Sequence, residues 1–215
     1  MILKTFDNEP SLMTGFLNEI RDKNIQSDRM RFRRNIERIG EIMAYEVSKC
    51  LHYEESQTET SLGIKKTHEL QDKVVICSIL RAGLSLHQGV MNYFDMSDSG
   101  FISANRVNTD KGVKVELAYK SLPIIDGKTL LLVDPMLATG ISMLESIKEL
   151  HKICKPEKLH ILAVVAAPEG VEYLGQHLDD DVTLWVATMD EGLNEKKYIV
   201  PGLGDAGDLA YGPKI

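Results

Sequence analysis

Apolar residues along this chain follow two spacings, one typical of buried strands and one typical of helices. They run almost without interruption through 74–80, 130–133 and 159–166, as in strands that are buried on both faces of a parallel sheet. After the first two runs, apolar residues return every three or four positions, which predicts a helix. Strands and helices in this order predict an α/β fold with a mostly parallel central sheet flanked by helices.

Helical spacing also dominates the start of the chain, so we expect N-terminal helices over about residues 11–52. A first helix over 11–25 has an apolar face that contains Leu12, Phe16, Leu17 and Ile20. Asp28 has the chemistry of a helix cap. The longer helix after it carries a core stripe made of Ile36, Ile39, Met43, Val47 and Cys50.

Two further regions alternate apolar and polar residues, which is the spacing of strands with one exposed face. Alternation at 58, 60, 62 and 64 indicates an edge strand ahead of the main sheet. Residues 101–107 and 113–119 also alternate, and residues 108–112 between them have hairpin-turn chemistry. We therefore predict a projecting β-hairpin that could close over a bound ligand and exclude water.

Length and charge narrow the class of protein. A chain of 215 residues fits one domain over 1–215, with a core over about 72–190. Its net charge of −7 gives no general attraction to nucleic acid or anionic membranes, so we expect neither partner. Cys50, Cys77 and Cys154 sit in apolar patterns and are predicted to be reduced, buried thiols. With no signal-peptide layout and no run of ~18 apolar residues, we expect a cytoplasmic protein.

The region 130–142 combines the features of a site for a sugar phosphate. A buried strand ends at Asp134, and Pro135 is predicted to end ladder pairing because proline has no N–H to donate. Small residues at 138–140 let the backbone approach a ligand, and the helix predicted next would direct its positive dipole end there. Because an acid repels a phosphate, the simplest explanation is that Asp134 takes ribose hydroxyls while the loop takes the phosphate.

Two motifs resemble those of a known enzyme family, and together they imply its fold. The first is Val133-Asp134-Pro135-Met136-Leu137-Ala138-Thr139-Gly140, which resembles the phosphoribosyl-pyrophosphate motif of uracil phosphoribosyltransferases. The second spans residues 198–208 and resembles that family's C-terminal uracil-binding segment. The resemblance implies a type I phosphoribosyltransferase fold with a projecting β-hairpin and a C-terminal base-binding hood.

The resemblance also implies which residues form the site. The donor, 5-phosphoribosyl 1-diphosphate, would be bound by Arg81, Arg106, Asp134, Pro135, Met136, Leu137, Ala138, Thr139, Gly140, Ile141, Ser142 and Asp205. Uracil would be bound by Ile199, Gly204, Asp205 and Ala206, and the catalytic residues would be Asp134, Arg81 and Asp205. Two alternatives stay open: Arg81 could pair with a surface acid, and Arg106 could be a surface charge of the hairpin.

The implied reaction joins N1 of uracil to the phosphoribosyl group, giving UMP and diphosphate in pyrimidine salvage. Mg²⁺ would be held mainly by the substrate's own diphosphate and ribose hydroxyls, with no metal ligand supplied directly by the protein. GTP is a candidate effector, and the apolar helices at the N-terminus predict a homodimer or larger oligomer. The alternatives are a non-catalytic nucleotide-sensing regulatory protein on the same fold, and a salvage enzyme for another base.

Some positions depart from the family pattern. Ile141 stands where glycine is usual, Leu209 where arginine is usual, and Ser85-Leu86 where Gly-Met is usual. A basic cluster also needs an explanation, and it consists of Arg29, Arg31, Arg33, Arg34 and Arg38. We interpret it as a solvated helix face, with a subunit contact at Phe32-Arg33 as the alternative.

Overall fold

An eight-stranded sheet forms the centre of the described part of the chain. The computed structural model describes residues 1–109 and 112–213, and between residues 104 and 117 it describes the backbone alone. The strands are β1 (Ile2–Thr5), β4 (Val74–Ile79), β5 (Asp98–Thr109), β6 (Gly112–Ser121), β7 (Thr129–Val133), β8 (Met136–Leu137), β9 (Lys158–Ala166) and β10 (Thr183–Met189). Their order is β1-β10-β9-β7-β4-β5-β6, with β8 beside β9. Every pair is parallel except β5 with β6, so the predicted mostly parallel sheet is confirmed.

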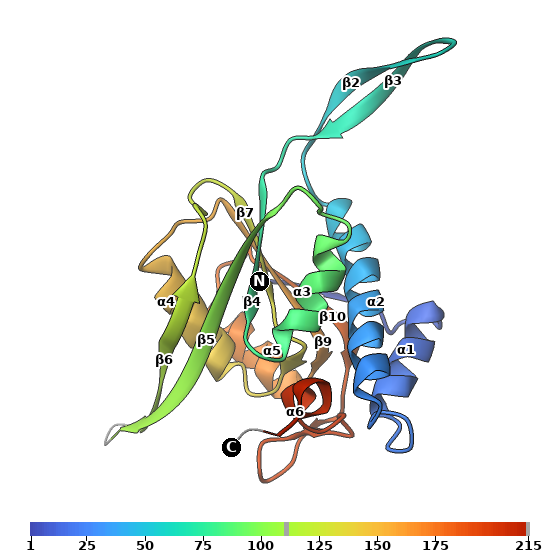
Figure 1. The fold of residues 1–215 in the computed structure, drawn as a ribbon. Helices are drawn as coiled ribbons and strands as arrows, with labels where there is room; N and C mark the ends of the chain where they lie inside the picture. The colour runs from blue at the N-terminus through green and yellow to red at the C-terminus, as the bar shows by residue number, and fades with distance from the viewer. Residues whose placement is uncertain (110–111, 214–215) are drawn as a thin grey trace.

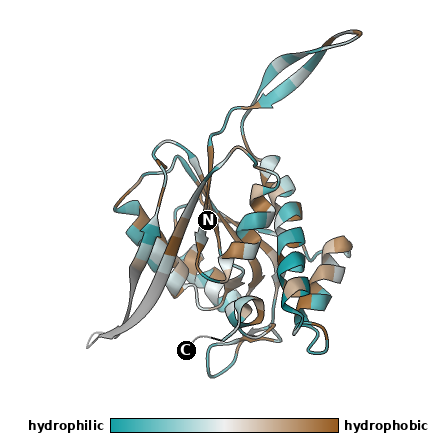
Figure 2. Cartoon of the chain, in the orientation of Figure 1, coloured by the Kyte–Doolittle hydropathy of each residue, from teal (hydrophilic) through white to brown (hydrophobic). Residues whose placement is uncertain are grey.

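Helices cover both faces of the sheet (Figure 1). One face is covered by α1 (Leu12–Arg21), α2 (Arg29–Ser48) and α3 (Gly83–Met91), the other by α4 (Ile141–His151) and α5 (Pro168–Gly175). Alternate residues of β4 divide between the two cores, with Ile76 in the first and Cys77 in the second. The central strands are accordingly hydrophobic along their length (Figure 2), as the uninterrupted apolar runs predicted.

The two N-terminal helices begin where the sequence predicted. Ser11 caps α1, and Asp28 caps α2 by accepting a hydrogen bond from the Arg31 N–H at 3.0 Å. The predicted stripe of α2 is buried from Ile36 to Val47. Cys50 is exposed, so its predicted burial was wrong: the helix ends at Ser48 and the next residues leave the buried face.

Arginines of the basic cluster on α2 find partners within the chain. Arg31 forms a two-pronged ion pair with Glu19 of α1, at 2.7 and 2.8 Å, and Arg34 pairs with Glu37 at 2.6 Å. Arg33 Nη1 donates to the Ala210 carbonyl at 2.7 Å. The cluster therefore joins α2 to its neighbours as well as facing solvent.

A hairpin that is separate from the main sheet projects from the body of the molecule (Figure 1). It consists of β2 (Tyr53–Thr60) and β3 (Gly63–Leu70), which pair only with each other in the described sheets. The single edge strand predicted over 58–64 was therefore wrong, because these residues span the end of β2, a turn and the start of β3. Alternation indicates an extended chain but not its partner, and Leu62, counted in that alternation, lies in the turn and is 99% exposed.

The hairpin predicted around residues 101–119 is present as β5 and β6. Two other features of the sheet differ from expectation. Strand β1 pairs with β10 and was not predicted. Pairing beside β9 resumes at β8 after Pro135, so this proline interrupts the ladder without ending it.

No thiol of Cys50, Cys77 and Cys154 forms a disulfide. Burial raises the pKa of the Cys77 thiol to about 12, so it stays protonated and unreactive. Within the described residues, no helix combines the length and the apolar character needed to cross a membrane.

Two buried histidines make stability depend on pH. Burial lowers the pKa of both His87 and His160 to about 4. Because the folded-state pKa lies below the unfolded value of about 6.5, the unfolded chain binds more protons in between. The stability that these two histidines contribute is therefore fully present above pH 6.5 and is lost as the pH falls toward 4. We expect the free energy of unfolding to drop by about 2 kcal/mol per histidine between pH 7.5 and pH 5.

Urea unfolding at these two pH values measures this drop. In the control variant His160→Gln, the amide oxygen can still accept the Trp185 Nε1 hydrogen bond, which the imidazole accepts at 3.2 Å. The variant should lose about half of the pH dependence. An unchanged pH dependence in His160→Gln would contradict the assignment.

Candidate active site

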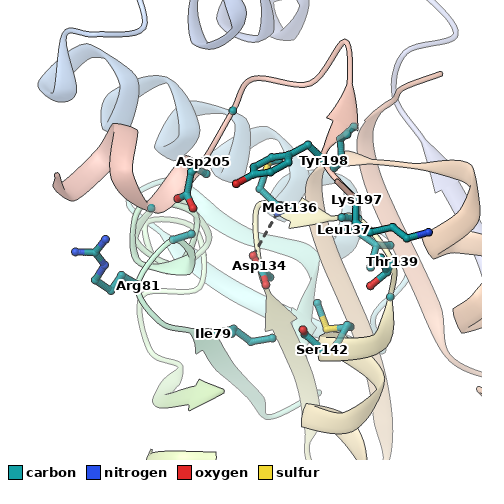
Figure 3. A pocket seen from close by; sticks show the side chains of 18 of the residues that line it. Ile79, Arg81, Asp134, Met136, Leu137, Thr139, Ser142, Lys197, Tyr198 and Asp205 are labelled. Carbon is teal, nitrogen blue, oxygen red and sulfur yellow. Dashed lines mark hydrogen bonds between the residues drawn. The ribbon is translucent and has the colours of Figure 1, made fainter. Parts of the chain in front are cut away.

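One cavity of about 490 Å³ lies at the carboxyl ends of the central strands. It is lined by the turn after β4, the loop after β7, and residues 196–199 and 204–207 from the C-terminal region. Figure 3 shows Asp134 in the middle of this lining, with Tyr198 and Asp205 above it and Ser142 below. Ligands of open α/β sheets bind at this edge because the loops that follow parallel strands converge there.

Asp134 is placed by the sheet itself. Its backbone N–H donates to the Leu162 carbonyl of β9 at 3.1 Å, directly after the last residue of β7. Its Oδ1 accepts a hydrogen bond from the Met136 N–H at 3.3 Å, which turns the chain into β8. The carboxylate is thus held at the strand end, facing the cavity (Figure 3).

Helix α4 begins at the cavity, and its N-cap residue is a glycine with no side chain; the first N–H of the helix, that of Ile141, donates to Thr139 Oγ1 at 3.4 Å. Its first turn contains no acid, and the residue before it, Gly140, has φ +76°. The helix N-terminus therefore presents its positive dipole end to the cavity with no carboxylate of its own first turn to neutralise it. Ile141 does not line the cavity and its side chain is 39% exposed, so the β-branched residue leaves the anion site open.

Arg81 lines the cavity, but its guanidinium is directed away from the other labelled side chains (Figure 3). Nη2 donates to Asp208 Oδ1 and to the Gly212 carbonyl, each at 3.0 Å. Nε is buried and has no hydrogen-bond partner among the described residues. The sequence left open whether Arg81 binds a ligand or pairs with an acid. The side chain forms the ion pair and also keeps an unsatisfied donor.

The C-terminal region folds over the cavity as a hood, by which we mean residues 190–212. It contains β11 (Gly192–Leu193), β12 (Ile199–Val200) and the short helix α6 (Ala206–Tyr211). Gly202 has φ +60°, and a Cβ there would lie 2.2 Å from the Ile199 carbonyl oxygen, so only glycine fits this turn. Asp205 caps α6 by accepting the Asp208 N–H at 2.9 Å, which gives this carboxylate a structural task beside the cavity.

Helix α6 is anchored from two further directions. The Tyr211 hydroxyl lies 2.8 Å from Ser85 Oγ of α3, and the Ala210 carbonyl accepts from Arg33 of α2. Leu209 packs against the core that the N-terminal helices share. Two positions that depart from the family pattern, 85 and 209, therefore both help to fix the hood.

Most of the site residues predicted from the sequence come together in this cavity. Those that line it are Arg81, Asp134, Met136, Leu137, Ala138, Thr139, Gly140, Ser142, Ile199, Gly204, Asp205 and Ala206. Pro135 and Ile141 belong to the same loop but do not line the cavity. Arg106 is on β5, and its side chain lies outside the described residues.

Sequence reasoning missed part of the lining. Lys196, Lys197 and Tyr198 border the cavity from the hood, and Met143 borders it from α4. Lys197 is the one non-glycine residue with positive φ, +63°, in the described backbone. Two lysines stand directly before the segment that resembles a uracil-binding segment, in a chain that is acidic as a whole. This pair was an available sequence signal for a polyanion site.

The fold and the site together define a class of protein. An acid, a small-residue loop and a helix start meet at the carboxyl edge of a parallel sheet, and this arrangement is that of the type I phosphoribosyltransferase fold. The solved structure of L. donovani hypoxanthine-guanine phosphoribosyl transferase shares this fold with a TM-score of 0.51 at 12% identity, covering 75% of this chain and 84% of that one. A family model described as uracil phosphoribosyltransferase matches residues 9–213. The chain is 46% identical to the uracil phosphoribosyltransferase of Porphyromonas gingivalis over 208 residues, covering 96% of both. It therefore belongs to the uracil phosphoribosyltransferase family.

A solved structure from Aquifex aeolicus agrees with this assignment in fold. It has a TM-score of 0.84 at 31% identity and covers 97% of this chain and 98% of that one. The curated uracil phosphoribosyltransferase of Thermococcus gammatolerans is 37% identical over 214 residues, covering 98% of this chain and 93% of its own length. The relationship therefore extends over nearly the whole chain.

Proposed function

We propose that this chain acts as a single phosphoribosyltransferase domain that transfers the 5-phosphoribosyl group from 5-phosphoribosyl 1-diphosphate to N1 of uracil. The products are UMP and diphosphate, so the reaction salvages pyrimidine. The observation that carries the proposal is one cavity in which a strand-end acid, a helix start without an acid in its first turn and a backbone-rich hood meet. These three parts suit a ribose, a phosphate and a flat base with polar edges.

The loop side of the cavity would bind the donor. Backbone N–H groups at the start of α4, with Thr139 and Ser142, would hold the 5′-phosphate, and Asp134 would accept hydrogen bonds from ribose hydroxyls. Pro135, Met136, Leu137 and Ala138 would shape the loop. Positive charge develops on the ribose as the bond to diphosphate breaks, so the Asp134 carboxylate would stabilise the transition state more than the ground state.

Cationic side chains would bind the departing diphosphate. The unsatisfied Nε supports this role for Arg81, and Nη2 would exchange its Asp208 contact for a diphosphate oxygen. Lys196 and Lys197 border the same cavity from the hood. For Arg106 the resemblance alone supports a diphosphate contact.

The hood would read the base through its main chain. Uracil presents an acceptor at O4 and a donor at N3, and cytosine reverses both. Backbone groups of Ile199, Gly204 and Ala206, which line the cavity, cannot change their polarity to suit cytosine. A site built on such groups rejects the wrong base by leaving buried groups unpaired. Asp205 would support this segment and the donor.

The carboxylates of the cavity suit a metal ion that is held mainly by its substrate. Among the described residues, no three His, Cys, Asp or Glu side chains gather to hold a metal ion. Asp134 and Asp205 both line the cavity, and they would contact Mg²⁺ through water while the diphosphate and ribose hydroxyls supply its direct ligands. Bound Mg²⁺ would neutralise charge on the diphosphate.

Three finer expectations rest on the resemblance and on the sequence. They are activation by GTP, assembly into a homodimer or larger oligomer, and a cytoplasmic location. Sedimentation of the purified chain, alone and with GTP, tests the first two together, because an effector acting through assembly would shift the oligomer distribution.

Formation of UMP from uracil and 5-phosphoribosyl 1-diphosphate with Mg²⁺ tests the proposed function, in single-turnover and steady-state form. We expect uracil turnover, with cytosine rejected by ~10⁴ or more, because cytosine leaves main-chain hydrogen-bonding groups unpaired. Orotate keeps the O4 and N3–H pattern of uracil and adds a carboxylate at C6, so as a second competitor it tests whether the cavity also excludes that group. Tight donor binding without turnover, with or without GTP, would overturn the enzyme and favour the nucleotide sensor.

A further inference from the structure

A desolvated ion pair lies beneath the hood, away from the groups that border the main cavity. Arg21, the last residue of α1, donates from Nη2 to Asp190 Oδ1 at 2.5 Å and from Nη1 to Asp190 Oδ2 at 2.9 Å. The Asp190 side chain is only 4% exposed and that of Arg21 is 20% exposed. Such a two-pronged pair fixes both side chains, and removing one partner leaves a buried charge without its counterion.

Both members of the pair also bind the backbone of Gly202. The Gly202 N–H donates to Asp190 Oδ2 at 2.8 Å, and the Gly202 carbonyl accepts from Arg21 Nη1 at 3.0 Å. The Asp190 N–H is in turn bonded to the Ala166 carbonyl of β9 at 2.9 Å. Gly202 is therefore clamped on both sides of its peptide backbone to a residue fixed by the main sheet.

Gly202 stands between the cavity-lining residues Ile199 and Gly204 of the hood. Because its left-handed turn aims the following backbone, a small rotation at Gly202 would move the main-chain groups at 204–206 relative to the base. We infer that Arg21 and Asp190 are positioning residues for the base: the pair holds the hood in the geometry that reads uracil. The inference deepens the proposed function and rests on its assignment of the hood to uracil.

The chain offers a matched pair for comparison. Arg31 and Glu19 form an equally two-pronged contact, at 2.7 and 2.8 Å, between α1 and α2, and within the described residues neither side chain hydrogen-bonds to the hood. Replacing arginine by lysine keeps the positive charge in each pair but removes the planar guanidinium, which donates from two nitrogens at once. At position 21, a lysine ammonium could replace Nη1, which donates to both Asp190 Oδ2 and the Gly202 carbonyl, but nothing would replace the Nη2 contact to Asp190 Oδ1.

The test compares Arg21→Lys with Arg31→Lys in steady-state kinetics. We expect Arg21→Lys to raise the KM for uracil about tenfold, to leave the KM for the phosphoribosyl donor unchanged, and to weaken discrimination against cytosine. Arg31→Lys should change none of these. A rise in both KM values, or a fall in Tm with unaltered KM values, would assign the pair a merely structural role and overturn the inference.

Hydrogen exchange supplies a readout that does not require turnover. In Arg21→Lys, backbone amides of residues 199–208 should exchange at least several-fold faster than in the parent, and those of β4 and β7 should not. Unchanged exchange in 199–208 overturns the clamp even if the kinetics change. If the parent chain shows no turnover with uracil, the proposed function fails, and the exchange comparison still decides whether the pair holds the hood.

Discussion

Asp134→Asn is expected to lower kcat/KM for UMP formation by about 10³-fold while the protein stays folded. Asparagine is nearly the same size and still offers an oxygen to the Met136 N–H, which Asp134 Oδ1 accepts at 3.3 Å. What it lacks is the negative charge at the strand end, where the ribose ring becomes positive in the transition state. The loss should therefore fall mainly on kcat, since an interaction made chiefly in the transition state is removed.

Asp98→Asn is the control for this variant. Asp98 begins β5, at the end of the strand away from the cavity. It forms an ion pair with Lys128 at 2.7 Å, and the Asp98 side chain is more than half exposed. Exposed pairs of this kind contribute about 1 kcal/mol at most. Asp98→Asn should therefore leave the kinetics unchanged. Equal kinetic effects in the two variants, measured at saturating Mg²⁺, would remove Asp134 from the catalytic site.

The centre of the fold was predictable because its strands are buried on both faces. β4 and β7 are buried along their whole length, so both faces select apolar residues and leave an uninterrupted run in the sequence. The loop after β7 was predictable for a different reason. Small residues, an acid and a helix start are required together by a sugar phosphate, and they lie next to one another in the chain.

What the sequence did not predict depends on partners that are distant in the chain. Arg21 and Asp190 are separated by 169 positions, and neither belongs to a local motif. β2 and β3 have alternating residues like those of an edge strand, but nothing in their own sequence says that the main sheet is not their partner. Lys196 and Lys197 are a visible basic pair in the sequence, but their position over the strand ends depends on the fold of the hood.

The departures from the family pattern also became interpretable only with neighbours in place. A β-branched residue at position 141 seemed to crowd a phosphate cradle, yet Ile141 lies outside the lining of the cavity. Ser85, where glycine is usual, lies 2.8 Å from the Tyr211 hydroxyl and so adds an anchor for α6. Both are compatible with an active site.

Gly170→Ala is expected to reduce kcat/KM for the phosphoribosyl donor by about 10²-fold, the second large effect. Gly170 lies in α5, where a Cβ would be 2.2 Å from the Ala138 carbonyl oxygen and 3.2 Å from the Gly140 nitrogen. Both atoms are backbone, so the new methyl group must push the phosphate loop away from α5. Overpacking of this kind costs about 1–3 kcal/mol, which for this chain length lowers Tm by several degrees.

Gly15→Ala separates the loss of stability from the loss of donor binding. Gly15 is in α1, and a Cβ there meets nothing within 4 Å, so alanine should raise stability by about 0.5–1 kcal/mol and leave the kinetics unchanged. Combined with Gly170→Ala, it should restore part of the Tm but none of the donor KM, because the displaced Ala138 carbonyl remains displaced. The KM for uracil should change little in either variant, because Arg21 and Asp190, which hold the hood at Gly202, do not belong to α5. If the double variant recovers its donor KM along with its Tm, then Gly170 acts through global stability. The loop over residues 138–140 would then not depend on close packing against α5.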